Sequence, residues 1–91
     1  MKTILKYPLK VTDSQDVLMP VGAQILCVQM QRETPCLWVM VDRDWRKQAP
    51  VKVTTCGTGH NATEPFGDYI GTYQMENTVV FHVFAAAQEG K

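Results

Sequence analysis

The sequence predicts an all-β fold with at most one short helical turn: a single domain of about six to eight short, mainly antiparallel strands in a sandwich or a partly open barrel. Runs of β-branched and aromatic residues, such as 51–55 and 79–84, are typical of strands, and no long apolar stripe has the helical period. A chain of 91 residues has the length of one domain. We expect residues 1–84 to form that domain, and residues 85–91, which have little to bury, to be a flexible C-terminal tail.

The N-terminal part of the chain predicts two strands and two turns. Residues 3–7 alternate between the two sides of a strand and stop at Pro8, which is typical of an edge strand. A turn at 12–14 precedes a short strand at 17–19. Residues 20–22 then favour a second turn, because proline fixes φ and glycine accepts positive φ.

The middle of the chain predicts the strands that carry most of the core. Residues 23–31 alternate regularly, so one side of this strand should face the core. That side carries Leu26, Val28 and Met30. After a turn at 32–35, residues 36–41 are apolar without interruption, which predicts a central strand covered on both faces.

The C-terminal half predicts three more strands. Residues 42–50 are mostly polar and form a solvated connection. The strand at 51–55 runs into a glycine-containing loop at 56–63. Strands at 69–74 and 79–84 follow, and the turn between them makes a hairpin.

Charge and hydropathy exclude two classes of partner. Nine Lys and Arg residues balance nine Asp and Glu residues, so no net field attracts nucleic acid or an acidic membrane surface. No apolar run approaches the ~20 residues of a membrane span. We therefore expect neither a nucleic-acid partner nor a membrane partner.

The cysteine content indicates a reducing compartment. Cys27, Cys36 and Cys56 are odd in number and lie in or beside apolar runs, which is typical of buried thiols rather than of a disulfide scaffold. We expect a cytoplasmic protein with three unbridged thiols.

Six motifs follow one another along almost the whole chain. They are Lys6-Tyr7; Met19-Pro20 with Gly22-Ala23; Pro35-Cys36-Leu37-Trp38; Gly57-Thr58-Gly59-His60; Tyr69-Ile70-Gly71-Thr72; and Phe81-His82-Val83-Phe84. In these motifs the chain resembles a family of short uncharacterised proteins of tailed phages, prophages and bacteria. The resemblance implies a phage accessory protein in the cytosol of the host cell and favours interference with host defence. It implies no particular activity.

The glycine-containing loop is the first candidate site. Gly57, Thr58, Gly59, His60 and Asn61 could present backbone N–H groups, a hydroxyl and an imidazole to a phosphate or a nucleotide. The loop lacks the Lys-Ser/Thr ending of a P-loop, and no helix is expected after it. The alternative is a tight structural turn in which His60 forms only local hydrogen bonds.

Histidine and cysteine residues offer weaker candidates. Cys36, Cys56, His60 and His82 include the residue types that hold zinc, but no two of them have the close spacing that starts such a site. We therefore expect no metal, no cofactor and no catalytic residues. His82 is expected to be a partly buried imidazole with one polar partner; the alternative is a pH-sensitive interface group.

The two tryptophans differ in their expected roles. Trp38 lies in an apolar strand and is expected in the core. Trp45 lies in a polar connection between Arg43 and Arg46, a pattern that favours contact with a partner. The alternative for Trp45 is that it folds back over the core. In the family that the chain resembles, this part varies most freely.

The sequence thus favours a non-enzymatic binding protein. It would capture a small anionic ligand such as a nucleotide signal, or block a host defence protein, and the phage setting of that role rests on the resemblance. The alternatives are a structural or assembly accessory protein without a ligand and a small hydrolase. Unpaired strand edges also predict a homo-oligomer.

Overall fold

The computed structural model describes residues 1–60, 66–76 and 78–88, which form seven strands and no helix. The strands are β1 (Lys2–Pro8), β2 (Ser14–Pro20), β3 (Gln24–Gln31), β4 (Thr34–Asp42), β5 (Gln48–Gly57), β6 (Asp68–Met75) and β7 (Val79–Ala85). The all-β prediction is confirmed, and each segment expected to be a strand lies within or overlaps one of the seven. Within the described residues, therefore, nothing forms a helix with the length and apolar character needed to cross a membrane.

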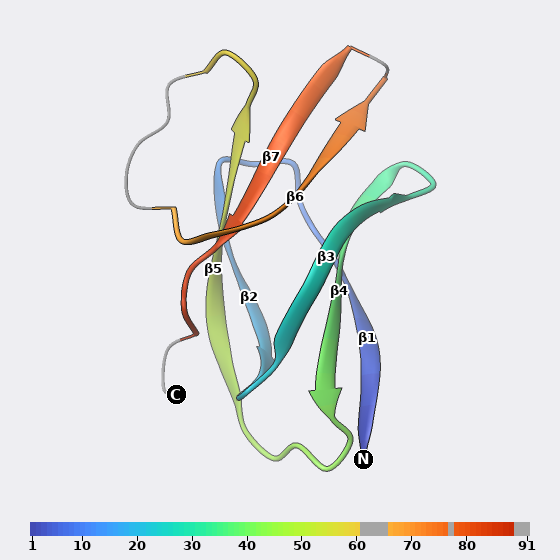
Figure 1. Ribbon diagram of the computed structural model, residues 1–91, viewed down its shortest axis with the longest axis vertical. Coiled ribbons are helices and arrows are strands. Elements are labelled where there is room, and N and C mark those ends of the chain that lie inside the picture. Colours follow the sequence, from blue (N-terminus) through green and yellow to red (C-terminus); the bar gives the residue numbers. More distant parts are fainter. Residues whose placement is uncertain (61–65, 77, 89–91) are drawn as a thin grey trace.

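The strands form two antiparallel sheets that pack as a sandwich (Figure 1). The first sheet has the order β1-β4-β3, and the second has the order β2-β5-β7-β6. The two sheets contact each other where β3 lies against β6, and they are not closed into a barrel. As expected, β1 is an edge strand and β4 is the central strand of its sheet.

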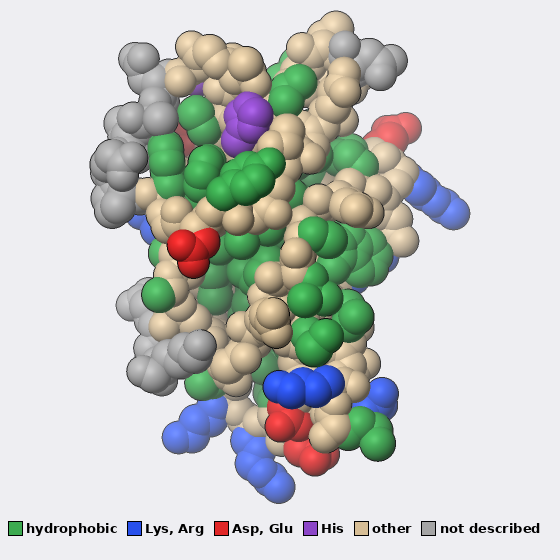
Figure 2. Space-filling model, in the orientation of Figure 1, with side chains coloured by type: hydrophobic (Ala, Val, Ile, Leu, Met, Phe, Trp, Pro, Cys, Tyr) green, Lys and Arg blue, Asp and Glu red, His purple; other side chains and the backbone are tan. Residues whose placement is uncertain are grey.

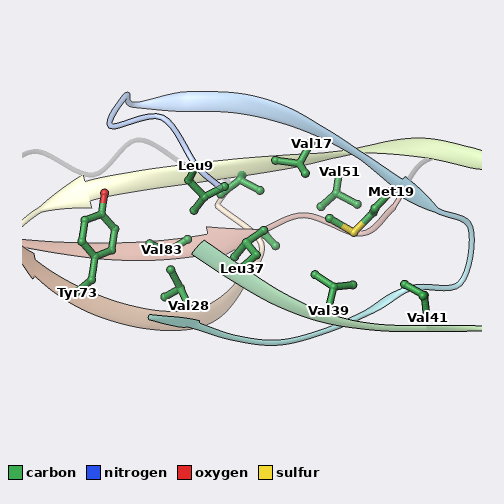
Figure 3. Close-up of a cluster of buried hydrophobic side chains, with 12 residues drawn as sticks. Leu9, Val17, Met19, Val28, Leu37, Val39, Val41, Val51, Tyr73 and Val83 are labelled. Carbon is green, nitrogen blue, oxygen red and sulfur yellow. The ribbon is translucent and has the colours of Figure 1, made fainter. Parts of the chain in front are cut away.

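The core lies between the two sheets and consists of one side of each strand (Figure 3). Because side chains alternate across a strand, every second residue of β4 and β5 points inward. The buried cluster contains Leu9, Val17, Met19, Val28, Leu37, Val39, Val41, Val51, Val53, Tyr73, Val83 and Ala85.

Two expectations for the first sheet were wrong in part. A register shift between Ile25 and Cys27 interrupts the pairing of β3 with β4, and Leu26 is 40% exposed instead of facing the core. The apolar β4 is not covered on both faces either. Its inward residues are buried, whereas Trp38 and Met40 on its outer face are only half-buried.

The C-terminal residues that the structure describes are packed against the domain. Ala85 is the last residue of β7 and is buried, and the Ala86 N–H donates a hydrogen bond to the Lys52 carbonyl (3.0 Å). The side-chain amide of Gln88 donates to three backbone carbonyls in β2 and β5 at 3.0–3.1 Å. These residues, which fall in the expected flexible tail, therefore belong to the folded domain; residues 89–91 lie outside the described residues.

Candidate functional site

The glycine loop begins with a tight turn at the end of β5. The His60 N–H donates a hydrogen bond to the Gly57 carbonyl across a four-residue turn (3.0 Å). Gly59, the third residue of this turn, has a φ of 85°, and a type II turn requires positive φ at that position. Gly59 is thus the residue that the turn geometry needs. Asn61, the last residue of the expected binding loop, lies outside the described residues.

Backbone N–H groups in this turn are already used within the chain. The Thr58 N–H donates to the Val80 carbonyl of β7 (3.0 Å), and the His60 N–H closes the turn. An anion cradle needs several N–H groups that point to the same place. Two of the amides that could have formed such a cradle are therefore occupied, which weakens the prediction of a backbone anion cradle at this turn.

The turn sends its two polar side chains to opposite faces of the second sheet. Strand alternation places Thr58 on the outer face with Cys56. The His60 ring lies instead against the inner side of Gly57, where a Cβ atom would be 2.8 Å from the ring nitrogen Nδ1. Thr58 and His60, which the sequence predicts as one site, therefore contribute to two different places.

On the outer face, a row of hydrogen-bonded side chains extends from the glycine turn across β7 to β6. The hydroxyl of Thr58 lies 2.7 Å from Nε2 of His82 on β7. The other imidazole nitrogen, Nδ1, lies 3.0 Å from the hydroxyl of Thr72 on β6. The Thr72 hydroxyl in turn lies 2.5 Å from the phenol oxygen of Tyr69. We call Thr58, His82, Thr72 and Tyr69 the threonine–histidine row.

The row can exist in two neutral arrangements. One nitrogen of a neutral imidazole donates and the other accepts, so one threonine hydroxyl donates to His82 while the other accepts from it. The Val80 carbonyl, 3.4 Å from the Thr58 hydroxyl, provides an acceptor for Thr58 in the arrangement in which Nε2 carries the proton. The row can therefore offer either a donor or an acceptor to a ligand with little movement of heavy atoms.

Aromatic rings adjoin the row. The Phe84 ring stacks on Phe66 with ring centroids 4.9 Å apart, and it meets Tyr69 edge-on at 5.7 Å. Tyr69 is 59% exposed and belongs to both sets. We call Phe66, Tyr69 and Phe84 the aromatic group. Figure 2 shows a histidine at the surface beside hydrophobic side chains, at the end of the molecule that carries the glycine turn.

A bulge in β6 brings the two sets together. Tyr69 and Thr72 are three residues apart, so regular alternation would place them on opposite faces. A register shift between Tyr69 and Gly71 changes this: Tyr69 pairs with Phe84, and Thr72 pairs with His82. Sequence reasoning missed Tyr69, Thr72, Phe84 and Phe66 because alternation gives no sign of this bulge. It expected one polar partner for His82, and the structure provides two.

The thiols and histidines do not assemble into a metal centre within the described parts of the chain. Among residues 1–60, 66–76 and 78–88, no three His, Cys, Asp or Glu residues are grouped closely enough to hold an ion. Cys56 pairs across the strands with His82, and its thiol lies 3.6 Å from the Gly57 carbonyl and 3.8 Å from the His60 carbonyl. No disulfide joins any of the three cysteines.

His60 closes a small pocket on the other side of β5. This pocket has a volume of about 150 Å³ and is lined by Val11, Thr12, Asp13, Thr55, Gly57, His60 and Phe81. The Thr55 hydroxyl is buried there and has no hydrogen-bond partner among the described residues. An unsatisfied buried hydroxyl is costly, which makes this pocket a second place where a polar group could bind.

The expected partner-binding residues lie at the opposite end of the molecule. Arg43, Trp45 and Arg46 are in the connection between β4 and β5, near the N-terminus and far from the glycine turn (Figure 1). The Trp45 indole is 41% exposed, and the Arg43 N–H donates to the Met1 carbonyl (2.8 Å). Figure 2 shows lysine and arginine side chains at this end. These residues and the threonine–histidine row cannot form one site.

Comparison with known proteins identifies a family but no activity. A family model described as "Domain of unknown function (DUF7352)" matches residues 1–91, the whole chain. Neither a curated protein nor a solved structure matches the chain.

Proposed function

The chain belongs to the DUF7352 family, and we propose that it is a non-enzymatic binding protein that captures a small nucleotide on the outer face of β5, β7 and β6. The observation that carries this proposal is that the threonine–histidine row and the aromatic group meet at Tyr69, whose ring is exposed. A nucleotide has both a flat base and hydrogen-bonding groups, so it needs both kinds of surface side by side.

The aromatic group suits the base. Every nucleobase has a flat π face, and stacking on a protein aromatic ring contributes about 1–3 kcal/mol per base. Tyr69 is exposed, and Thr72 holds its phenol oxygen in place. A ring fixed before binding loses little conformational entropy when the ligand arrives.

The row suits the polar groups of the ligand. Hydroxyls of Thr58 and Thr72 both donate and accept hydrogen bonds, and the imidazole between them adjusts its proton to match. Side chains rather than backbone N–H groups would contact the ligand, because the Thr58 and His60 N–H groups already donate within the chain.

The biological role that we propose is that of a phage or prophage accessory protein in the host cytosol. Its support is the resemblance to short phage and prophage proteins. Sequestering a nucleotide signal would counteract a host defence that uses such a signal, and it requires only binding. Blocking a host defence protein and serving as a ligand-free structural protein are the alternatives that the experiment must separate.

Nucleotide binding can be tested by calorimetry against nucleoside mono-, di- and cyclic phosphates. Tyr69→Ala removes the exposed ring and is expected to weaken binding about tenfold to a hundredfold, which corresponds to the loss of one stacking contact. Thr58→Val is expected to weaken binding while the melting temperature stays within a few degrees. His60→Ala is the matched control, because His60 lies near Thr58 in sequence but on the opposite face of the sheet. It should leave the affinity unchanged.

Each other outcome has a definite meaning. If no nucleotide binds, the nucleotide proposal is refuted, and blocking a host defence protein and a ligand-free structural role remain as the explanations. If nucleotides bind but Tyr69→Ala and Thr58→Val have no effect, the ligand site lies elsewhere. If only His60→Ala weakens binding, the site is the pocket beneath the glycine turn.

One observation favours hydrolysis as a second candidate. The Thr58 hydroxyl is 2.7 Å from Nε2 of His82, and Thr72 holds the other nitrogen, which is the arrangement of a nucleophile, a base and an orienting group. The described hydrogen-bond partners of His82 are hydroxyls, and neither is a carboxylate that would stabilise an imidazolium. Recovery of the intact nucleotide after prolonged incubation supports capture, whereas accumulation of a product that Thr58→Val abolishes would support hydrolysis.

A further inference from the structure

A second hollow with a different chemistry lies on the outer face of the first sheet, beside the β3–β4 hairpin. It has a volume of about 490 Å³. Its lining residues are Lys6, Pro8, Gln31, Arg32, Thr34 and Cys36. They come from all three strands of that sheet and from the hairpin turn. Since the threonine–histidine row lies on the other sheet, this hollow is separate from the proposed nucleotide site.

Strand register explains why these residues meet. Pro8 pairs with Cys36, and Gln31 pairs with Thr34, so each pair shares one face of the sheet. Lys6 is two residues before Pro8 and therefore projects from the same face. The core side chains occupy the opposite face, so the polar residues are fixed on the outer face by the same register that buries the core.

The hollow is rich in hydrogen-bond donors. Lys6 and Arg32 each carry a positive charge, and the Thr34 hydroxyl adds a donor. The Lys6 ammonium group donates to the side-chain oxygen of Gln31, which holds the lysine in place while its other protons can serve a ligand. None of the described residues that line the hollow carries a carboxylate. This set of groups favours an anion.

The backbone at Arg32 gives an independent indication. Arg32 is the first of the two residues that join β3 to β4, and its φ is 57°. A two-residue hairpin with positive φ at this position favours glycine, so arginine costs free energy that glycine would avoid. Strain of this kind suggests a function for the side chain. Here it places a guanidinium group at the hollow beside Lys6.

We propose that this hollow binds the phosphate or pyrophosphate group of a small ligand. Arginine contacts two phosphate oxygens at once, and lysine adds a compact charge, so the pair suits a phosphate better than a single cation would. The phosphate group comes either from a free inorganic anion or from a nucleotide, and the two sources present the same chemistry to Lys6 and Arg32.

The probe is pyrophosphate, titrated at low ionic strength into the isotope-labelled protein and followed by amide chemical shifts. Saturable shifts are expected at Lys6 and at residues 31–34. Arg32→Gly should weaken binding about tenfold to a hundredfold, the range expected for loss of a charged hydrogen-bonding group. The same substitution should leave the melting temperature unchanged or raise it, because glycine accepts the positive φ.

Glu76→Gly is the matched control for the backbone effect, because Glu76 is the other non-glycine residue with positive φ among those described, at 52°. It should relieve strain in the same way and leave pyrophosphate affinity within twofold. Lys6→Gln should weaken binding about tenfold or more, whereas Lys2→Gln, on the same strand, should change it less than twofold.

The results decide the proposal in either direction. Localised saturation by pyrophosphate supports a free phosphate ligand, and at least tenfold tighter saturation by a nucleoside diphosphate supports a nucleotide. Shifts that spread over exposed lysines without saturating would overturn the proposal. So would full retention of affinity in Arg32→Gly, or a loss in Lys2→Gln equal to that in Lys6→Gln.

Discussion

Replacing Gly67 with alanine is expected to destabilise the protein through two separate effects. Gly67 lies just before β6 and has a φ of 96°, a conformation that L side chains rarely adopt. An added Cβ would also lie 2.3 Å from the carbonyl oxygen of Ala85 and 2.7 Å from Cα of Ala86. These are backbone atoms, so no flexible side chain can move aside. The segment before β6 would have to shift away from the end of β7.

The expected loss of stability follows from adding the two effects. Positive φ costs an alanine roughly 1–2 kcal/mol. Relieving a steric overlap in a packed region costs typically about 1–3 kcal/mol more. The sum, roughly 2–5 kcal/mol, is a large part of the ~5–15 kcal/mol that stabilises a domain. The aromatic group should be disturbed as well, because Phe66 precedes Gly67 and stacks on Phe84.

Gly59→Ala separates the two effects. Gly59 has a φ of 85°, but among the described residues no heavy atom beyond Gly59 and its two chain neighbours lies within 4 Å of the position that a Cβ would occupy. This variant should lose only the roughly 1–2 kcal/mol of the backbone effect. Urea unfolding of both variants, analysed with a common m-value, gives the difference in free energy of unfolding. Equal midpoints for Gly67→Ala and Gly59→Ala would refute the steric argument.

Four further outcomes are expected. Thr55→Val should raise the free energy of unfolding by about 1–3 kcal/mol, since it removes a buried hydroxyl without a described partner; a lower melting temperature would contradict this. Burial raises the pKa of Tyr73 above its usual value of 10.0, so the contribution of Tyr73 to stability should be constant below pH 10 and be lost as pH rises through the folded pKa. Tyr73→Phe should flatten that alkaline decrease, and an unchanged slope would count against it. Gln88→Glu should destabilise more than Gln88→Ala, because both remove the donor to three backbone carbonyls but only the carboxylate places a negative charge against their oxygens; equal losses would contradict this. Ile4 and Leu26 are apolar residues of the first sheet that are 52% and 40% exposed, so we expect the protein to self-associate. Light scattering that finds only the 10.3 kDa monomer would disprove this.

Strand positions could be predicted from the sequence because they depend on local signals. Alternation, β-branched runs and the turn residues between them are properties of short segments, and each of the seven strands was expected. The strands extend beyond the predicted ranges by a few residues at several ends, since backbone pairing continues into polar residues such as Gln48. The order β2-β5-β7-β6 could not be predicted, because it depends on pairing between segments far apart in the chain.

The candidate site was predicted less completely than the fold. The sequence drew attention to Thr58 and His60 as one group, whereas the sheet separates them onto opposite faces. It singled out His82 but not its partners on β6, because Tyr69 and Thr72 share a face only through the bulge. A bulge depends on the pairing of two strands and leaves no regular pattern in either one.

The geometry of the threonine–histidine row follows from the packing on the opposite side of the sheet. A shift of one residue in β7 would turn His82 inward and Val83 outward, which would bury an imidazole and expose a core side chain. Val83 is fully buried, so the hydrophobic core opposes that shift strongly. The core therefore fixes His82 between Thr58 and Thr72 without any help from a ligand. Because the row is already formed before a ligand arrives, binding would cost little conformational entropy at these side chains.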